Sequence, residues 1–178
     1  MKYTELSLRG AYLVIPEPIP DQRGFFARSW DVREFEAHHL ETRIVQCNIS
    51  FNSKRGTVRG MHFQRAPHEE VKYVRCTQGA IFDVIIDLRD DSPTRLRWEG
   101  VELTAENRFS LYVPRGFAHG YQTLQDDTEV TYQVSESYHP ESEGALLWND
   151  PALAIDWPIS EVVISEKDRN APPLTARA

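Results

Sequence analysis

Short segments rich in β-branched and aromatic residues recur along the chain, with turn signals between them. The longest, residues 80–88, reads Ala-Ile-Phe-Asp-Val-Ile-Ile-Asp-Leu, and others span residues 44–50, 71–76, 98–103, 109–113 and 128–134. Glycine, proline and aspartate gather in the intervals, as at Asp90-Asp91-Ser92-Pro93. Evenly spaced short strands separated by turns are typical of a sandwich or a closed barrel. A parallel sheet would need long helices between the strands, and the pattern shows none.

One stretch, residues 31–40, has a helical pattern, with Asp31 suited to the N-cap and with Phe35 and Leu40 on one side. We therefore expect one short helix near the N-terminus. A chain of 178 residues is most simply a single domain, here residues 1–178.

The C-terminal part of the chain is rich in proline and predicts irregular chain that wraps the barrel. Its prolines are Pro151, Pro158, Pro172 and Pro173. We expect the last residues, Thr175 to Ala178, to be frayed.

The composition indicates which kinds of binding partner and which cellular compartment to expect. A net charge of −7 argues against a nucleic-acid-binding surface, although a few local arginines can still hold a small anion. The first six residues lack the apolar core of a signal peptide, and no apolar run approaches the ~18 residues of a membrane helix. Cys47 and Cys76 form no close-spaced motif, which is typical of reduced thiols. These features predict a cytoplasmic protein that does not bind a membrane.

Two glycine-punctuated β motifs each carry one histidine. The first is Arg59-Gly60-Met61-His62-Phe63-Gln64-Arg65, and the second is Pro114-Arg115-Gly116-Phe117-Ala118-His119-Gly120-Tyr121. Histidine can accept or donate a proton near neutral pH. Each of these two histidines could instead be an inert, hydrogen-bonded core residue. The other four have no such setting: His38 and His39 lie on the predicted helix, and His68 and His139 lie beside turns.

A metal or nucleotide cofactor is not expected. Metal-binding cupin barrels usually begin their site with His-x-His, but Gln64, a weak neutral donor, stands where the second histidine would be. Glu69 or Glu70 and His119 would complete such a site only poorly. Neither Gly-x-Gly-x-x-Gly nor a Walker motif is found. Arg23 and Arg59, each directly before a glycine, could hold a diphosphate or could be surface arginines.

Side-chain parity places two ionisable residues on inward faces. Residues two apart in a strand share a face, so Tyr132 lies on the side of Val130 and Val134. Lys72 likewise lies on the side of Val74. Buried lysines are rare unless they are paired or functional. Asp168 looks locally like a polar turn residue, and its pairing with a histidine would have to be nonlocal.

Taken together, the motifs resemble those of the dTDP-4-dehydrorhamnose 3,5-epimerase family, over nearly the whole chain and in order. The matching blocks include Asp21-x-Arg23-Gly24-Phe25-Phe26, Gln46-x-Asn48-x-Ser50, Arg59 to Gln64, Lys72-x-x-Arg75-Cys76, Gly79 to Arg89, Ser92-Pro93-Thr94, Pro114 to Gly120, Glu143-Gly144, Leu147 to Pro151, Trp157-Pro158 and Ser165-x-Lys167-Asp168.

The resemblance implies an all-β, cupin-like jelly-roll barrel (a double-stranded β-helix), usually a homodimer, with neither a metal nor an organic cofactor. It implies a nucleotide-diphosphate deoxysugar as substrate, converted from dTDP-4-dehydro-6-deoxyglucose to dTDP-4-dehydrorhamnose in dTDP-rhamnose and polysaccharide biosynthesis. The 4-keto group acidifies the hydrogens at C3 and C5, so either centre can be inverted by proton removal and return without a hydride carrier.

The resemblance also implies a role for each site residue. His62 would be the base, Asp168 would orient it, Lys72 would stabilise the enolate oxygen, and Tyr132 would protonate the opposite face. Tyr138 would be a platform for the nucleotide base, and Phe26 a second stacking surface contributed across the dimer. The full set of implied binding residues is Arg23, Phe26, Gln46, Asn48, Arg59, His119, Tyr138, Glu143 and Lys167.

Two positions depart from the family pattern and leave the substrate open. Arg28 stands where an acidic residue is common, and Cys47 stands where an aspartate is common. Arg28 reverses the charge expected near the nucleoside, so a different nucleotide is an alternative. Further alternatives are a 3- or 5-epimerase that acts at one carbon, a cupin that binds a sugar nucleotide without turnover, and a metal-dependent cupin, which Gln64 argues against.

Overall fold

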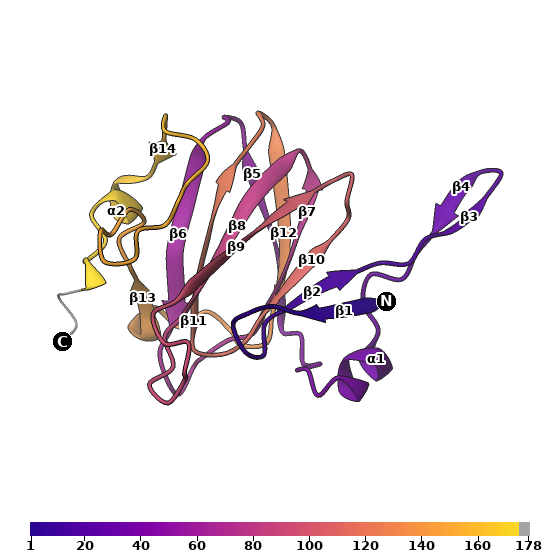
Figure 1. Cartoon of the computed structure of the whole chain (residues 1–178), viewed down its shortest axis with the longest axis horizontal. Helices are drawn as coiled ribbons and strands as arrows, with labels where there is room; N and C mark the ends of the chain where they lie inside the picture. Colours follow the sequence, from indigo (N-terminus) through magenta and orange to yellow (C-terminus); the bar gives the residue numbers. More distant parts are fainter. Residues whose placement is uncertain (175–178) are drawn as a thin grey trace.

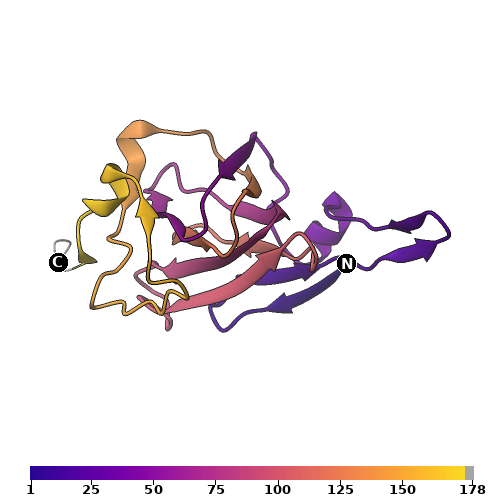
Figure 2. The ribbon, with the colours of Figure 1, turned by 90° about the horizontal axis from the view of Figure 1, so that it is seen from above.

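The protein is built from two antiparallel sheets that face each other, as a computed structural model of the chain shows (Figure 1, Figure 2). The structure describes residues 1–174, and the end that the sequence predicted to be frayed, residues 175–178, lies outside the described residues. The strand order is β1-β2-β10-β7-β12-β5 in the first sheet and β13-β6-β11-β8-β9 in the second, with β14 parallel to β6. This is the all-β, cupin-like jelly roll that the sequence predicted.

The first sheet contains β1 (Lys2–Glu5), β2 (Tyr12–Ile15), β10 (Ser110–Val113), β7 (Lys72–Gln78), β12 (Thr128–Val134) and β5 (Gln46–Asn52). The second contains β13 (Glu143–Ala145), β6 (Thr57–Gln64), β11 (Phe117–Thr123), β8 (Ala80–Asp87), β9 (Trp98–Thr104) and β14 (Val163–Ile164). A separate hairpin of β3 (Ile19–Asp21) and β4 (Gly24–Phe26) projects away from the barrel in Figure 1.

The hydrophobic core has layers inside and outside the barrel, and β8 belongs to both. Ile81 and Ile85 point between the sheets toward Val74 and Val130 of the first sheet. The alternate residues of β8 pack outward under the C-terminal segment, with Leu146, Leu153 and Ile155. A strand that is buried on both faces needs apolar residues at successive positions, which explains the long apolar run.

Within the described residues, the short helical elements outside the sheets are α1 (Val32–Ala37), the 3-10 turn η1 (Pro140–Ser142) and α2 (Glu166–Arg169). The predicted N-cap of α1 is confirmed, because Asp31 accepts hydrogen bonds from the backbone of Arg33 and Glu34. The expectation of a single helix was wrong. At four residues, α2 is too short to show a helical period, and its start is marked only by the cap that Ser165 provides. No helix within residues 1–174 is long and apolar enough to span a bilayer.

The glycines of the two histidine motifs allow β6 and β11 to approach closely. A Cβ atom on Gly60 would lie 2.6 Å from the Cα of Gly120, and one on Gly120 would lie 2.7 Å from the carbonyl oxygen of Arg59. Gly60 also has a φ of +118°, which side chains rarely adopt. In the resulting register His62 stands directly opposite His119. The glycine contact therefore places the two histidines side by side.

Asp87, at the end of β8, anchors the turn that follows. Its buried carboxylate accepts hydrogen bonds from Arg89 (Nε 2.9 Å, Nη2 2.7 Å), from Thr94 Oγ1 (2.7 Å) and from Ser92 Oγ. Burial alone would raise the pKa of Asp87, but these hydrogen bonds outweigh burial and lower it. The carboxylate is therefore ionised in the folded protein at neutral pH.

We expect Asp87→Ala to lower the free energy of unfolding by about 3–5 kcal/mol, because it leaves the Arg89 charge without its buried partner. Asp90→Ala, which removes an exposed carboxylate in the same turn, is the matched control and should change stability little. Since the pKa of Asp87 is depressed by folding, its contribution is full above the unfolded pKa of about 3.9 and is lost as the pH falls below it. Urea unfolding at pH 7 and pH 3 measures both effects, and equal losses in the two variants would contradict this role.

Candidate active site

A cavity with two adjoining lobes lies between the sheets, with volumes of about 300 and 180 Å³. His62, Lys72 and Tyr132 line both lobes, so they stand where the lobes meet. Ten of the residues that the sequence singled out line this cavity: Gln46, Asn48, Arg59, His62, Lys72, His119, Tyr132, Tyr138, Glu143 and Asp168.

His62 on β6 forms a dyad with Asp168 on α2. The His62 Nε2 atom lies 2.7 Å from Asp168 Oδ1. The backbone N–H of Gly60 donates to Asp168 Oδ2, and the backbone N–H of Asp168 donates to Ser165 Oγ. Burial alone would raise the pKa of Asp168, but the hydrogen bond and charge of His62 outweigh it and lower that pKa. An ionised Asp168 must accept, so Nε2 carries the proton and Nδ1 keeps the lone pair in neutral His62. The dyad therefore presents a base.

Lys72 and Tyr132 come from the sheet opposite His62. Their strands β7 and β12 are neighbours, and because Lys72 pairs with Val134, Tyr132 is its diagonal neighbour on the same face. This confirms the inward parity predicted for both residues. Asn48 stands directly opposite Tyr132 on β5 and extends the same polar face. The cavity thus has a base on one wall, and an ammonium and a phenol on the other.

The surroundings of Tyr132 keep its phenol protonated. Burial raises the pKa of Tyr132, the negative charge of Glu70 raises it further, and Arg59 opposes this only in part. The Glu70 carboxylate lies 3.2 Å from Lys72 Nζ, and both side chains are largely buried. Sequence reasoning considered Glu70 only as a metal ligand, because its contact with Lys72 depends on the conformation of the loop before β7.

His119 belongs to a second histidine–carboxylate pair. Its Nε2 atom lies 2.5 Å from Oδ1 of Asp83, whose side chain is fully buried. Asp83 is a site residue that sequence reasoning missed. The signal was present: Asp83 shares the inward face of β8 with Ile81 and Ile85, where an unpaired carboxylate would be costly.

A hydrogen-bonded group closes the inner end of the cavity and joins the two sheets. The Tyr121 hydroxyl lies 2.8 Å from Ser50 Oγ, and Asn52 Nδ2 donates to the same hydroxyl at 3.2 Å. Arg59 Nε donates to Asn52 Oδ1 at 2.7 Å. The guanidinium of Arg59 is therefore held in place beside the cavity.

The larger lobe, lined by Gln46, Tyr138 and Glu143 and here called the outer lobe, has an aromatic and charged rim. Lys167 Nζ lies 2.6 Å from Glu143 Oε1, and the Tyr138 hydroxyl donates to Glu143 Oε2 at 3.2 Å. The Gln46 side chain accepts from the backbone N–H of Tyr138 at 3.1 Å. Tyr138 as a whole is 56% exposed, so a ligand can reach it. Lys167 does not line the cavity and joins the rim through Glu143.

Gln64 uses its amide to hold two loops together. Its Nε2 donates to the carbonyl oxygens of His68 (2.9 Å) and Ser137 (3.0 Å), and its Oε1 accepts from the backbone N–H of His139 (2.7 Å). Gln64 therefore acts as a bridge between these loops at the cavity wall.

Two predicted binding residues are not brought to this cavity within the chain. Arg23 and Phe26 lie on the projecting β3-β4 hairpin (Figure 1), and Arg23 forms an exposed ion pair with Asp21. Phe26 is 62% exposed. Arg28, which departs from the family pattern, lies at the base of the hairpin, where its Nη1 atom forms an ion pair with Asp31 Oδ2 at 3.4 Å. None of the three lines either lobe.

Comparisons with known proteins agree with this arrangement. The family model for dTDP-4-dehydrorhamnose 3,5-epimerase matches residues 5–176. The dTDP-4-dehydrorhamnose 3,5-epimerase of Methanothermobacter thermautotrophicus is 44% identical, covering 97% of this chain and 94% of that protein. The crystal structure of the enzyme of that name from Elizabethkingia anophelis has a TM-score of 0.97 at 40% identity, covering 99% of this chain and 98% of that one.

The Bacillus anthracis dTDP-4-dehydrorhamnose 3,5-epimerase, solved with TDP and PPi bound, has a TM-score of 0.94 at 43% identity and covers 97% of this chain and 99% of that one. The family model, the related sequence and the related structures thus each match nearly the full length of this chain. The chain belongs to the dTDP-4-dehydrorhamnose 3,5-epimerase family, and is an epimerase of the isomerase class.

Proposed function

We propose that this chain converts dTDP-4-dehydro-6-deoxyglucose to dTDP-4-dehydrorhamnose by inverting C3 and C5. The observation that carries the proposal is the placement of the His62–Asp168 dyad on one wall of the cavity, with Tyr132 and Lys72 on the other. Inversion by proton transfer needs a base and an acid on opposite faces of the sugar. The relative solved with TDP and PPi bound supports a thymidine nucleotide.

In the proposed reaction His62 removes the proton from C3 or C5. The C–H electron pair forms a double bond from that carbon to C4, and the carbonyl π pair moves onto the C4 oxygen to give an enolate. Lys72 stabilises this oxygen, because a preorganised positive charge is most effective where water is excluded. Tyr132 then delivers a proton to the other face of the same carbon. The keto group itself acidifies both hydrogens, so this chemistry needs neither a hydride carrier nor an organic cofactor.

The outer lobe is the proposed nucleotide site. Tyr138 offers its ring to the base, with Gln46 and Asn48 lining the same lobe. Lys167 on the rim and Arg59 deeper in the cavity supply positive charge for the diphosphate. His119, held by Asp83, lies beside His62 and is placed to contact the sugar.

We propose that the active form is a homodimer in which Arg23 and Phe26 reach the cavity of the partner subunit. Their hairpin projects from the barrel with Ile19 and Phe26 exposed, which a monomer would leave in water. The edge strand β5, which borders the cavity, is unpaired on one side and exposes Ile49 and Phe51. Both features fit an interface that carries the hairpin to a second barrel.

A mixing experiment tests this arrangement. Arg23→Ala and His62→Ala should each be nearly inactive alone, but an equimolar mixture that has exchanged subunits should recover about a quarter of wild-type activity. Random mixing makes half of the dimers mixed, and one of the two cavities in each then has both residues. If Arg23 serves its own cavity, no mixed dimer has a complete site and no activity returns. Light scattering of each sample establishes the dimer.

We also propose a cytoplasmic location. Cys47 is exposed and Cys76 is buried, and both are free thiols, as is usual in a reducing compartment.

The substrate proposal is tested by supplying dTDP-4-dehydro-6-deoxyglucose with a reductase that accepts only the rhamno product, and following NADPH oxidation. Oxidation that depends on this chain supports the proposal. The same assay with CDP-, GDP- and UDP-linked sugars tests the nucleotide. Faster turnover of any of them than of the dTDP sugar would contradict the choice of thymidine and direct attention to Arg28.

A further inference from the structure

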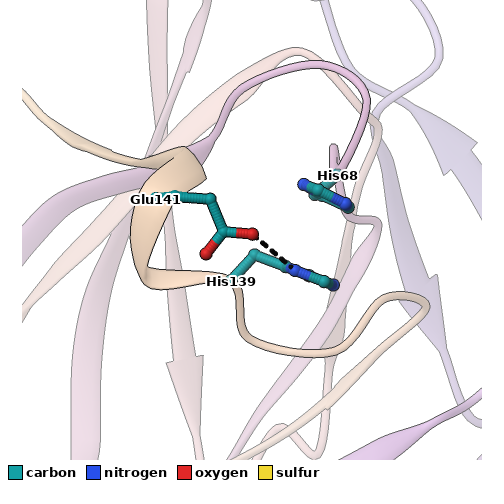
Figure 3. Close-up of side chains that lie close together, drawn as sticks. All are labelled: His68, His139 and Glu141. Carbon is teal, nitrogen blue, oxygen red and sulfur yellow. Dashed lines mark hydrogen bonds and ion pairs between the residues drawn. The ribbon is translucent and has the colours of Figure 1, made fainter.

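A cluster of two histidines and a glutamate lies outside the barrel interior, beside the proposed nucleotide rim (Figure 3). The imidazole rings of His68 and His139 are stacked, with centroids 3.6 Å apart and planes at 7°. Glu141 Oε1 lies 3.0 Å from His139 Nδ1, to one side of the stack. The Ser142 hydroxyl lies 2.8 Å from His68 Nδ1. Nothing in the proposed reaction uses these side chains.

The cluster has the donor set of a transition-metal site, with its ligand atoms close together. One nitrogen from each histidine and one oxygen from Glu141 lie within 4.8 Å of one another. Imidazole with a carboxylate suits Zn²⁺, Ni²⁺ or Cu²⁺, whereas Mg²⁺ and Ca²⁺ require mainly oxygen ligands.

We propose that His68, His139 and Glu141 form a surface binding site for a zinc-type transition-metal ion. It is separate from the barrel interior, where His62 and Asp168 form the proposed catalytic dyad.

Metal binding requires a small closure of the cluster. Tetrahedral bonds of about 2.0–2.1 Å place ligand atoms ~3.3 Å apart, so the donors must approach by up to about 1.5 Å. Because the two imidazole rings are nearly parallel, their ring-nitrogen lone pairs do not point toward one common ion. One of the rings must therefore tilt before both histidines can bind the same ion. The side chains of Glu141 and His139 are 65% and 31% exposed, which leaves both room to move. Protonation of either histidine removes a ligand, so affinity falls as the pH is lowered.

The position of the cluster gives a bound ion a structural effect. His68 precedes the segment that carries Glu70 and Lys72, while His139 directly follows Tyr138. These two segments are already joined by the Gln64 amide. An ion held by ligands from both segments would be a second connection between them, at the rim of the cavity.

The test is a titration of tag-free, chelator-treated full-length protein with ZnCl₂ by calorimetry, and with Co²⁺ followed by its visible absorption. We expect one ion per chain, with His139→Ala and Glu141→Gln each weakening binding at least about tenfold. Excess Mg²⁺ should not compete. His39→Asn is the matched control, since His39 is exposed in the turn that follows α1 and asparagine tolerates its φ of 58°.

Because Glu141 is exposed, Glu141→Gln keeps the proposal testable even if His139→Ala disturbs the fold, which near-UV circular dichroism would reveal. The proposal is overturned if the wild-type protein shows no saturable Zn²⁺ binding, or if these variants bind as tightly as the wild type. Equal weakening by His39→Asn would also overturn it. None of these readouts depends on epimerase activity.

Discussion

Replacing His62 with alanine should lower the turnover number by about 10²–10⁴-fold, the usual contribution of a positioned general base. Nucleotide affinity should stay within about threefold of wild type, because a group that acts mainly in the transition state contributes little to ground-state binding. The outer lobe retains Tyr138, Gln46 and Asn48 in this variant. Initial rates by the reductase-coupled assay and dTDP affinity by calorimetry measure the two quantities.

Asp168→Asn is the companion variant. It leaves the imidazole of His62 in place but removes the charge that fixes its tautomer, so we expect a smaller loss of turnover than for His62→Ala. Turnover of His62→Ala within tenfold of wild type would remove this residue from the role of base.

Tyr132→Phe should separate proton removal from inversion. Loss of the phenol removes the proton donor on the wall opposite His62, so product formation should fall by about 10²–10⁴-fold. Exchange of the substrate hydrogens with solvent should persist, because His62 and Lys72 still form the enolate and His62 can return a solvent-derived proton to the same face. The two rates are measured in one sample, by NMR for exchange and by the reductase assay for product.

The matched control for this variant is Tyr73→Phe. Tyr73 lies on β7 but faces away from the cavity, and its hydroxyl donates to the backbone carbonyl of Ser29. Equal loss of exchange and inversion in Tyr132→Phe would show that this tyrosine is needed before the enolate forms, which would contradict its assignment as the opposite-face acid.

The parts of the site that follow from strand periodicity could be predicted from sequence. Lys72 and Tyr132 share inward faces with valines of their own strands, so parity alone placed them between the sheets. The same reasoning applied to β8 would have found Asp83, whose neighbours on that face are isoleucines. Helix α1 was predictable because its N-cap and apolar side are local features.

Nonlocal contacts could not be predicted in this way. His62 and Asp168 are separated by 106 positions and meet only because α2 packs beside β6. No local pattern marks so short a helix, and the assignment of Asp168 came from family resemblance. The pairing of Glu70 with Lys72 depends on a loop conformation, and the positions of Arg23 and Phe26 relative to a cavity depend on a second subunit.

The most direct test of proton-transfer epimerisation is proton NMR of dTDP-4-dehydro-6-deoxyglucose incubated with the protein in heavy water. The proposed mechanism predicts deuterium at both C3 and C5, with the rhamno product trapped by the reductase. Deuterium at one carbon alone would contradict double inversion and identify a single-site epimerase. Absence of label at both carbons, in a sample that binds the nucleotide, would contradict the proposed reaction on this sugar.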